Sequence, residues 1–130
     1  MASSYLIHSE RSLVVIARTE RIGSDEWEAL MNAVLADPAF LRGYALVDDR
    51  RESADVPTRS DVERAARWIH DQSARLGAIR WAIVVNPASL AAFGMTRVVE
   101  ALTSQTSVVV RAFTDLPAAT AWATGQAEPL

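Results

Sequence analysis

Residues 108–122 place a strand signal, a turn and a helix start in immediate succession. Residues 108–113 form a short run rich in β-branched and aromatic side chains, which is typical of a buried strand. Asp115 follows as a natural helix N-cap, and Pro117 stands in the first helical turn, where proline is tolerated. The same order of strand and helix occurs earlier in the chain, so the sequence predicts an α/β fold.

The remaining strand and helix signals alternate along the chain. The predicted strands are residues 5–8, 12–18, 44–47, 79–85 and 108–113. Three polar residues separate the first two strands, which indicates an antiparallel hairpin, whereas a helix follows each later strand and requires a crossover to a parallel neighbour. We therefore expect a five-stranded, mostly parallel sheet with an N-terminal antiparallel hairpin strand and four helices.

Capping residues mark the predicted helix ends. Ser24 is a candidate N-cap for the first helix, which Pro38 terminates. Ser60 and Glu63 match a capping box at the start of a helix over residues 60–76, and Gly77 stands where a left-handed C-terminal residue belongs. A third helix is predicted over residues 89–103, and the tail from residue 124 is expected to fray.

Length and composition indicate one domain over residues 1–130, with an ordered core at about 5–123. Half of the residues are hydrophobic, yet no apolar run approaches the ~20 residues that span a bilayer. We therefore expect a cytoplasmic protein without membrane insertion. The absence of cysteine excludes disulfides, thiolate metal ligands and cysteine nucleophiles.

All 13 basic residues are arginines, so mechanisms that need a lysine amine are excluded. The net charge is −3, and the arginines alternate with acids instead of forming a basic stripe. A phosphate backbone would find little net attraction, so we expect no nucleic-acid partner.

The carboxyl ends of the strands are the predicted ligand site, because open α/β sheets bind ligands there. The connection over residues 48–58 is longer than the roughly 2 to 6 residues usual for such loops, and its arginines suit a carboxylate or phosphate. The candidate ligand-binding residues are Asp48, Arg50, Arg51, Arg59, Asn86, Ser89, Arg97 and Thr114. The alternative is a solvated loop whose charges neutralise one another.

Catalytic and metal sites receive little support from the residue pattern. Asp48 and Asp49 are adjacent in a strand and point to opposite faces, so they do not converge on one substrate. His8 and His70 lack metal-ligand spacing, and the four tryptophans suit core packing. We expect no catalytic residues, no metal and no cofactor.

Several short motifs resemble the SpoIIAA-like STAS/SEC14 domain family. They are residues 37–40 (DPAF), 46–48 (LVD), 93–97 (FGMTR), 110–116 (VRAFTDL) and 121–122 (AW). The resemblance extends over residues 5–122 and implies a βα superhelix with a largely parallel sheet, as in anti-sigma-factor antagonists, the cytosolic domains of sulphate transporters and the lipid-carrier domain of the SEC14 type.

The chain departs from those antagonists at their phosphorylation motif, an Asp-Ser-Ser/Thr-Gly tetrad at a helix start. Here residues 55–61 read DVPTRSD, without the glycine. If a kinase acts on this chain, the predicted acceptor is Thr58 or Ser60, where a phosphate meets the positive end of a helix dipole.

We expect a non-catalytic STAS-like module, regulatory or ligand-binding, whose ligand is a small anionic or amphipathic molecule or a partner protein. The alternative is a small enzyme that uses carboxylates and arginines at the edge of the sheet. Because several strands are apolar at successive positions, both faces of the sheet require cover. We therefore also expect a homodimer, unless the helices wind on both faces.

Overall fold

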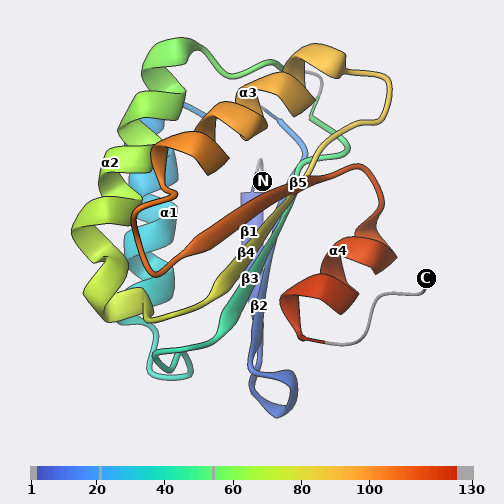
Figure 1. Cartoon of the computed structure of the whole chain (residues 1–130). Helices are drawn as coiled ribbons and strands as arrows, with labels where there is room; N and C mark the ends of the chain where they lie inside the picture. The colour runs from blue at the N-terminus through green and yellow to red at the C-terminus, as the bar shows by residue number, and fades with distance from the viewer. Residues whose placement is uncertain (1–2, 21, 54, 126–130) are drawn as a thin grey trace.

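A five-stranded sheet in sequential order lies at the centre of the computed structural model, which describes residues 3–20, 22–53 and 55–125 (Figure 1). The strands are β1 (Ser3–His8), β2 (Leu13–Arg18), β3 (Ala45–Asp49), β4 (Arg80–Val84) and β5 (Val109–Phe113). β1 is antiparallel to β2, and every later neighbouring pair is parallel. The predicted layout of the sheet is confirmed.

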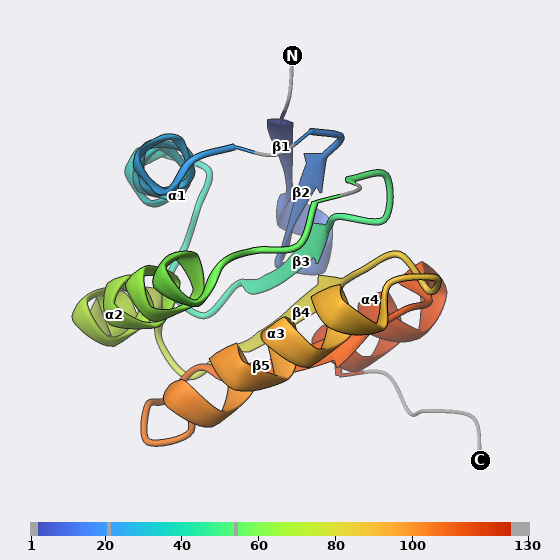
Figure 2. The ribbon, with the colours of Figure 1, turned by 90° about the horizontal axis from the view of Figure 1, so that it is seen from above.

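Four α-helices cover the two faces of this sheet unequally. They are α1 (Ser24–Ala36), α2 (Arg59–Leu76), α3 (Leu90–Leu102) and α4 (Leu116–Ala123), and a short 3-10 turn, η1 (Ser9–Arg11), joins β1 to β2. α1, α2 and α3 lie on one face, hereafter the first face, and α4 lies on the second (Figures 1 and 2). The described helices therefore wind on both sides of the sheet.

Alternating side chains divide the core between these faces. On the first face, Ile16, Leu46 and Trp81 pack with the helices α1 to α3. On the second face, Val47 and its neighbours pack against α4, whose Trp122 is buried there. Parallel strands covered on both sides read as continuous apolar runs, which explains why the strand signals in this sequence are so uniform.

Two of the predicted caps are wrong. The residue before Ser24, Gly23, is the N-cap of α1, and Ser24 is the first residue of the helix. α2 begins at Arg59 because Thr58 and Asp61 form the capping box: the Asp61 amide donates to Thr58 Oγ1 (3.1 Å) and the Thr58 amide donates to Asp61 Oδ2 (3.1 Å). This box lies two residues closer to the N-terminus than the predicted one at Ser60.

Other helix ends agree with the sequence. Asp115 caps α4 by accepting from the Ala118 amide at 3.0 Å, and proline stands in the first turn. Gly77 ends α2 with φ 88° and ψ −170°, so the expected positive φ is present, but the full left-handed geometry is not. The amides of Thr124 and Gly125 donate to carbonyls of α4. The rest of the tail that is predicted to fray, residues 126–130, lies outside the described residues.

In the part of the chain that the structure describes, no helix combines the length and the apolar character needed to cross a membrane.

Candidate functional site

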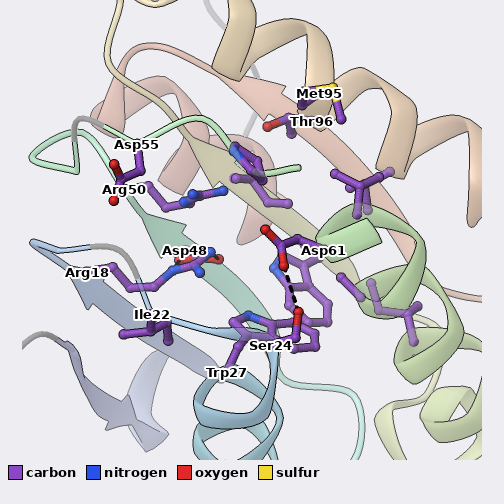
Figure 3. Close-up of a pocket in the computed structure, with 17 residues that line it drawn as sticks. Arg18, Ile22, Ser24, Trp27, Asp48, Arg50, Asp55, Asp61, Met95 and Thr96 are labelled. Carbon is purple, nitrogen blue, oxygen red and sulfur yellow. Dashed lines mark hydrogen bonds and ion pairs between the residues drawn. The ribbon is translucent and has the colours of Figure 1, made fainter. Parts of the chain in front are cut away.

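A cavity of about 70 Å³ opens on the first face, at the carboxyl ends of β2 and β3 (Figure 3). Helices α1, α2 and α3 wall it with apolar side chains, and the strands and the loop over residues 48–58 supply most of its charges. Its apolar wall includes Ile22, Trp27, Val62, Ile69, Trp81, Ile83, Met95 and Val99, and its polar lining is Arg18, Ser24, Asp48, Arg50, Asp55, Asp61 and Thr96.

A buried ion pair forms the floor of the cavity. Asp48 is only 1% exposed, and Arg18 grips it with two donors: Nε lies 3.0 Å from Oδ1, and Nη2 contacts Oδ2. The register of the sheet creates this pair, because Ile16 of β2 lies beside Asp48 of β3 and Arg18 follows two residues later on the same face. Both oxygens of the carboxylate are therefore occupied.

Arg50 is the second arginine of the cavity, and its guanidinium points inward (Figure 3). Its own amide donates to the Val84 carbonyl (2.8 Å), which fixes the chain beyond β3 against the neighbouring strand. Burial lowers the pKa of Arg50 to about 10; Arg18 acts in the same direction, and the carboxylates of Asp48, Asp55 and Asp61 oppose it. The side chain therefore stays cationic at neutral pH in spite of its partial desolvation.

Two donors of the cavity lack a partner. Within the described residues, the buried side-chain polar atoms without a hydrogen bond are Arg50 Nε, Ser53 Oγ and Trp81 Nε1. Of these three residues, Arg50 and Trp81 line the cavity, and Trp81 is 1% exposed. A buried donor without an acceptor costs about 1 to 3 kcal/mol, so native proteins rarely leave two of them at one place without a reason.

An aromatic cluster holds the Trp81 indole in place. Trp27 stacks on it with ring centroids 6.4 Å apart and an interplanar angle of 22°, and Trp68 meets both rings edge-on at 5.4 and 6.3 Å. Trp68 Nε1 donates to Asn32 Oδ1 (3.1 Å), in contrast to the unpartnered Nε1 of Trp81. The cluster confirms that these tryptophans pack in the core, and it holds the ring of Trp81, a residue of the cavity lining, in place.

Asp61 joins the starts of two helices beside the cavity. Its Oδ1 accepts from Ser24 Oγ at 2.9 Å, across from α1, while Oδ2 belongs to the capping box of α2 (Figure 3). Asp55, in contrast, is an exposed residue of the loop. The charged lining thus contains Arg18 and Arg50 against Asp48, Asp55 and Asp61, which gives a formal net charge of −1 from these two cations and three anions.

The structure brings together only part of the predicted site. Asp48 and Arg50 line the cavity, but six other predicted residues lie outside its lining: Arg51, Arg59, Asn86, Ser89, Arg97 and Thr114. The three arginines of this group pair with acids on their own segments instead, Arg51 with Asp49, Arg59 with Glu63 and Arg97 with Glu100.

The polar residues of that group serve local structure. Asn86 Oδ1 accepts from the Ala88 amide at 2.9 Å within its own turn, and Ser89 caps α3. Thr114 follows β5, where the chain turns to the second face and into α4, away from the cavity. The carboxyl ends of parallel strands lie at one edge of the sheet. The segments that follow them lead to different faces, so residues just beyond the strands need not lie together.

Neither predicted phosphoacceptor lines the cavity. Thr58 Oγ1 is engaged as the N-cap of α2, and Ser60 is an exposed residue of the first turn. Phosphorylation at either residue stays a prediction.

Sequence reasoning did not name the other residues of the lining as site residues, and among those it missed, Arg18, Asp55, Asp61 and Trp81 matter most to the site. A signal for Arg18 was present, since Val14, Ile16 and Arg18 alternate on one face of a strand and end on a charge. Trp81 carried no such signal, because an indole in a buried strand is ordinarily core.

Among the described residues, no group of three or more histidine, aspartate or glutamate side chains is placed to hold a metal ion. The chain matches no protein-family model, no curated protein and no solved structure, so the functional argument rests on the geometry of this cavity.

Proposed function

We propose that this protein is a non-catalytic binding module that takes a small ligand into the cavity at the carboxyl ends of β2 and β3. The observation that carries the proposal is that two residues which line the cavity, Arg50 and Trp81, each have a buried donor, Nε and Nε1, without a partner among the described residues. A ligand with a hydrogen-bond acceptor would satisfy them, and the apolar wall would cover the rest of the ligand.

The carboxylates of the cavity favour binding over catalysis. A general base needs an oxygen that is within reach of the substrate. Both oxygens of Asp48 accept from Arg18, and both oxygens of Asp61 accept from the starts of α1 and α2. These two acids hold the shape of the site, whereas the third, Asp55, lies exposed to solvent in the loop.

A thermal-shift experiment with four small probes tests the proposal: butyrate, butyramide, butylamine and butyl phosphate. Ala65 of α2 lines the cavity, so Ala65→Leu fills the space without changing its charges. We expect at least one probe to raise the melting temperature of the unmodified protein, because a ligand at about 100 times its Kd stabilises by roughly 2.7 kcal/mol. The same probe should have no effect on Ala65→Leu.

Arg51→Met is the matched control, since it removes an arginine of the same loop that lies outside the cavity. It should respond to the probe as the unmodified protein does. Circular dichroism verifies that Ala65→Leu is folded. If no probe stabilises the protein, or if the filled variant responds equally, the cavity is not a ligand site.

A further inference from the structure

We propose that the ligand of this cavity is a monocarboxylate with a short hydrocarbon chain. This inference rests on the proposed binding function and adds the chemical class of the ligand. It is argued from three properties of the cavity: its unused hydrogen-bonding groups, its charge and its size.

The buried side-chain groups without a partner in the residues that line the cavity are donors. Arg50 Nε and Trp81 Nε1 have no acceptor among the described residues, whereas the acceptor oxygens of Asp48 and Asp61 are already engaged. A group that only donates, such as an ammonium ion, would leave both donors unsatisfied. A carboxylate only accepts, so it suits a site whose unpartnered buried groups are donors. Hydrogen bonds between an arginine and a carboxylate are also stronger than bonds between neutral groups.

The charge of the lining sets a limit on the charge of the ligand. Arg18 is committed to Asp48, which leaves Arg50 as the cation that faces the cavity without a hydrogen-bonded carboxylate among the described residues. One negative charge on the ligand complements this arginine. A phosphate dianion would bring a second negative charge beside Asp48, Asp55 and Asp61, and like charges at this distance repel.

The carboxylate of Asp55 would compete with a ligand carboxylate for the positive charge of Arg50. Its carboxylate acts on Arg50 from the loop, raising the pKa that burial lowers, and it is exposed to solvent. A ligand carboxylate at Arg50 must overcome repulsion from Asp55. Removal of that charge is therefore expected to strengthen the binding of a carboxylate and to weaken the binding of a cation, so the sign of the effect reports the class of the ligand.

The size of the cavity limits the hydrocarbon chain. A cavity of about 150 Å³ is enough to hold benzene, so the 70 Å³ found here holds a carboxylate head and only the first carbons of a chain. Ile69, Met95 and Val99 supply the apolar surface for those carbons.

Titration calorimetry at neutral pH with the same four probes tests the class. Butyrate should bind more than about tenfold tighter than butyramide, which has the same shape without the charge, since hydrogen bonds to charged groups contribute about 1.5 to 3 kcal/mol. Butyl phosphate and butylamine should bind more weakly than butyrate. Asp55→Asn should tighten butyrate by roughly two- to fivefold. Arg50→Met should abolish butyrate binding, and Arg51→Met should leave it unchanged.

The possible results separate the class of ligand from the binding function. Tighter binding of butylamine, butyramide or butyl phosphate in the cavity would overturn the carboxylate and leave the binding function intact. An Asp55→Asn variant that binds butyrate with equal or lower affinity than the unmodified protein would also overturn the carboxylate and leave the binding function intact. Failure of all four probes to bind in the cavity would remove both proposals. Because Asp55 is exposed and Arg50 is partly desolvated, neither substitution is expected to prevent folding.

Discussion

Asp48 and Asp49 are neighbours in β3, yet they occupy opposite faces of the sheet and different environments. Asp48 is 1% exposed and pairs with Arg18, which is thirty residues away in the sequence. Asp49 points to the second face and pairs with Arg51, two residues further on, whose side chain is 42% exposed. Both are two-donor contacts between an arginine and an aspartate. The side chains of Arg18 and Asp48 are 11% and 1% exposed, and those of Arg51 and Asp49 are 42% and 19% exposed, so the pairs differ chiefly in their access to solvent.

That difference determines what each pair does. In water, the attraction between two charges is largely cancelled by hydration, and exposed pairs contribute about 0 to 1 kcal/mol. In the interior, either charge of the Arg18–Asp48 pair would destabilise the fold if the other were absent. The buried pair therefore acts as a structural unit that keeps the floor of the cavity in place. Arg50 completes the comparison, because it is a desolvated charge next to the buried pair whose Nε lacks a hydrogen-bonded partner among the described residues.

The largest expected effect is that of Asp48→Asn. The substitution keeps the size of the side chain and removes the charge that neutralises Arg18, and breaking a buried pair in this way costs about 3 to 5 kcal/mol. We expect that loss in the free energy of unfolding, measured by urea denaturation at neutral pH. Asp49→Asn is the matched control and should cost less than about 1 kcal/mol. Equal losses in the two variants would show that the two faces do not differ in this respect.

A second, smaller effect of opposite sign is expected for Arg50→Met. Burial lowers the pKa of Arg50 to about 10, and each unit of such a shift corresponds to about 1.4 kcal/mol, so the variant should be more stable at neutral pH by up to roughly 3 kcal/mol. Above pH 10 the folded protein releases this proton while the unfolded chain still holds it, so the stability of the unmodified protein rises relative to the variant.

The advantage of Arg50→Met should therefore narrow as the pH rises through about 10. Parallel urea titrations of both proteins at neutral and alkaline pH measure this gap. Arg51→Met, which removes a solvated arginine, should show neither the gain nor its pH dependence. A destabilised Arg50→Met protein at neutral pH would mean that Arg50 has a structural role instead of a ligand-binding one.

The smallest expected effect on stability lies on the second face. Leu6 of β1 is 66% exposed and lies opposite Val15, which packs against the core of that face. Because the described helices wind on both faces (Figure 1), the general reason for predicting a homodimer is removed. The apolar surface nevertheless continues beyond α4 to this edge of the sheet, and a second copy of the chain would cover it there. Light scattering should give about twice the chain mass of 14.2 kDa, and Leu6→Ser should reduce it to one chain.

Leu6→Ser should change the free energy of unfolding of the isolated chain by less than about 0.5 kcal/mol, as is usual for surface substitutions. Leu90→Ser, at an 85% exposed position at the start of α3 on the first face, is the control and should not alter the mass. A mass near 14.2 kDa for the unmodified protein would contradict the dimer, and α4 would then be sufficient cover for the second face.

The sequence predicted the elements and their order well, because alternation and caps are local signals. It misplaced the capping box because Thr58 with Asp61 and Ser60 with Glu63 fit nearly the same pattern, and only the backbone geometry distinguishes them. It also predicted that Asp48 and Asp49 face apart. The alternation of side chains along a strand shows that the two residues lie on opposite faces, but it does not show which of the two is shielded from solvent.

Only part of the cavity lining could be predicted from the sequence, because local signals do not show how distant segments pack. The carboxyl edge and the loop over residues 48–58 follow from general properties of parallel sheets, and Asp48 and Arg50 were found in this way. Arg51 was included because it is adjacent in sequence, although alternation places it with Asp49. Arg18 and Trp81 come from other strands, and their meeting depends on the register between strands, which a single sequence does not state.

Each strand of the sheet lies beside the strand that precedes it in the sequence. During synthesis, the strand beside which each new strand will lie has therefore already been made. Each connection between parallel strands contains one helix, so the connections are short and the entropy lost in closing them is small. The residues that line the cavity come from β2, β3, β4, the connections after β2 and β3, and the first three helices. α3 packs against β5 as well as α2, and its Glu100 accepts from the Ala112 amide of β5. We therefore expect the binding site to be complete only when β5 has joined the sheet, so that α4 adds to a domain whose site is already formed.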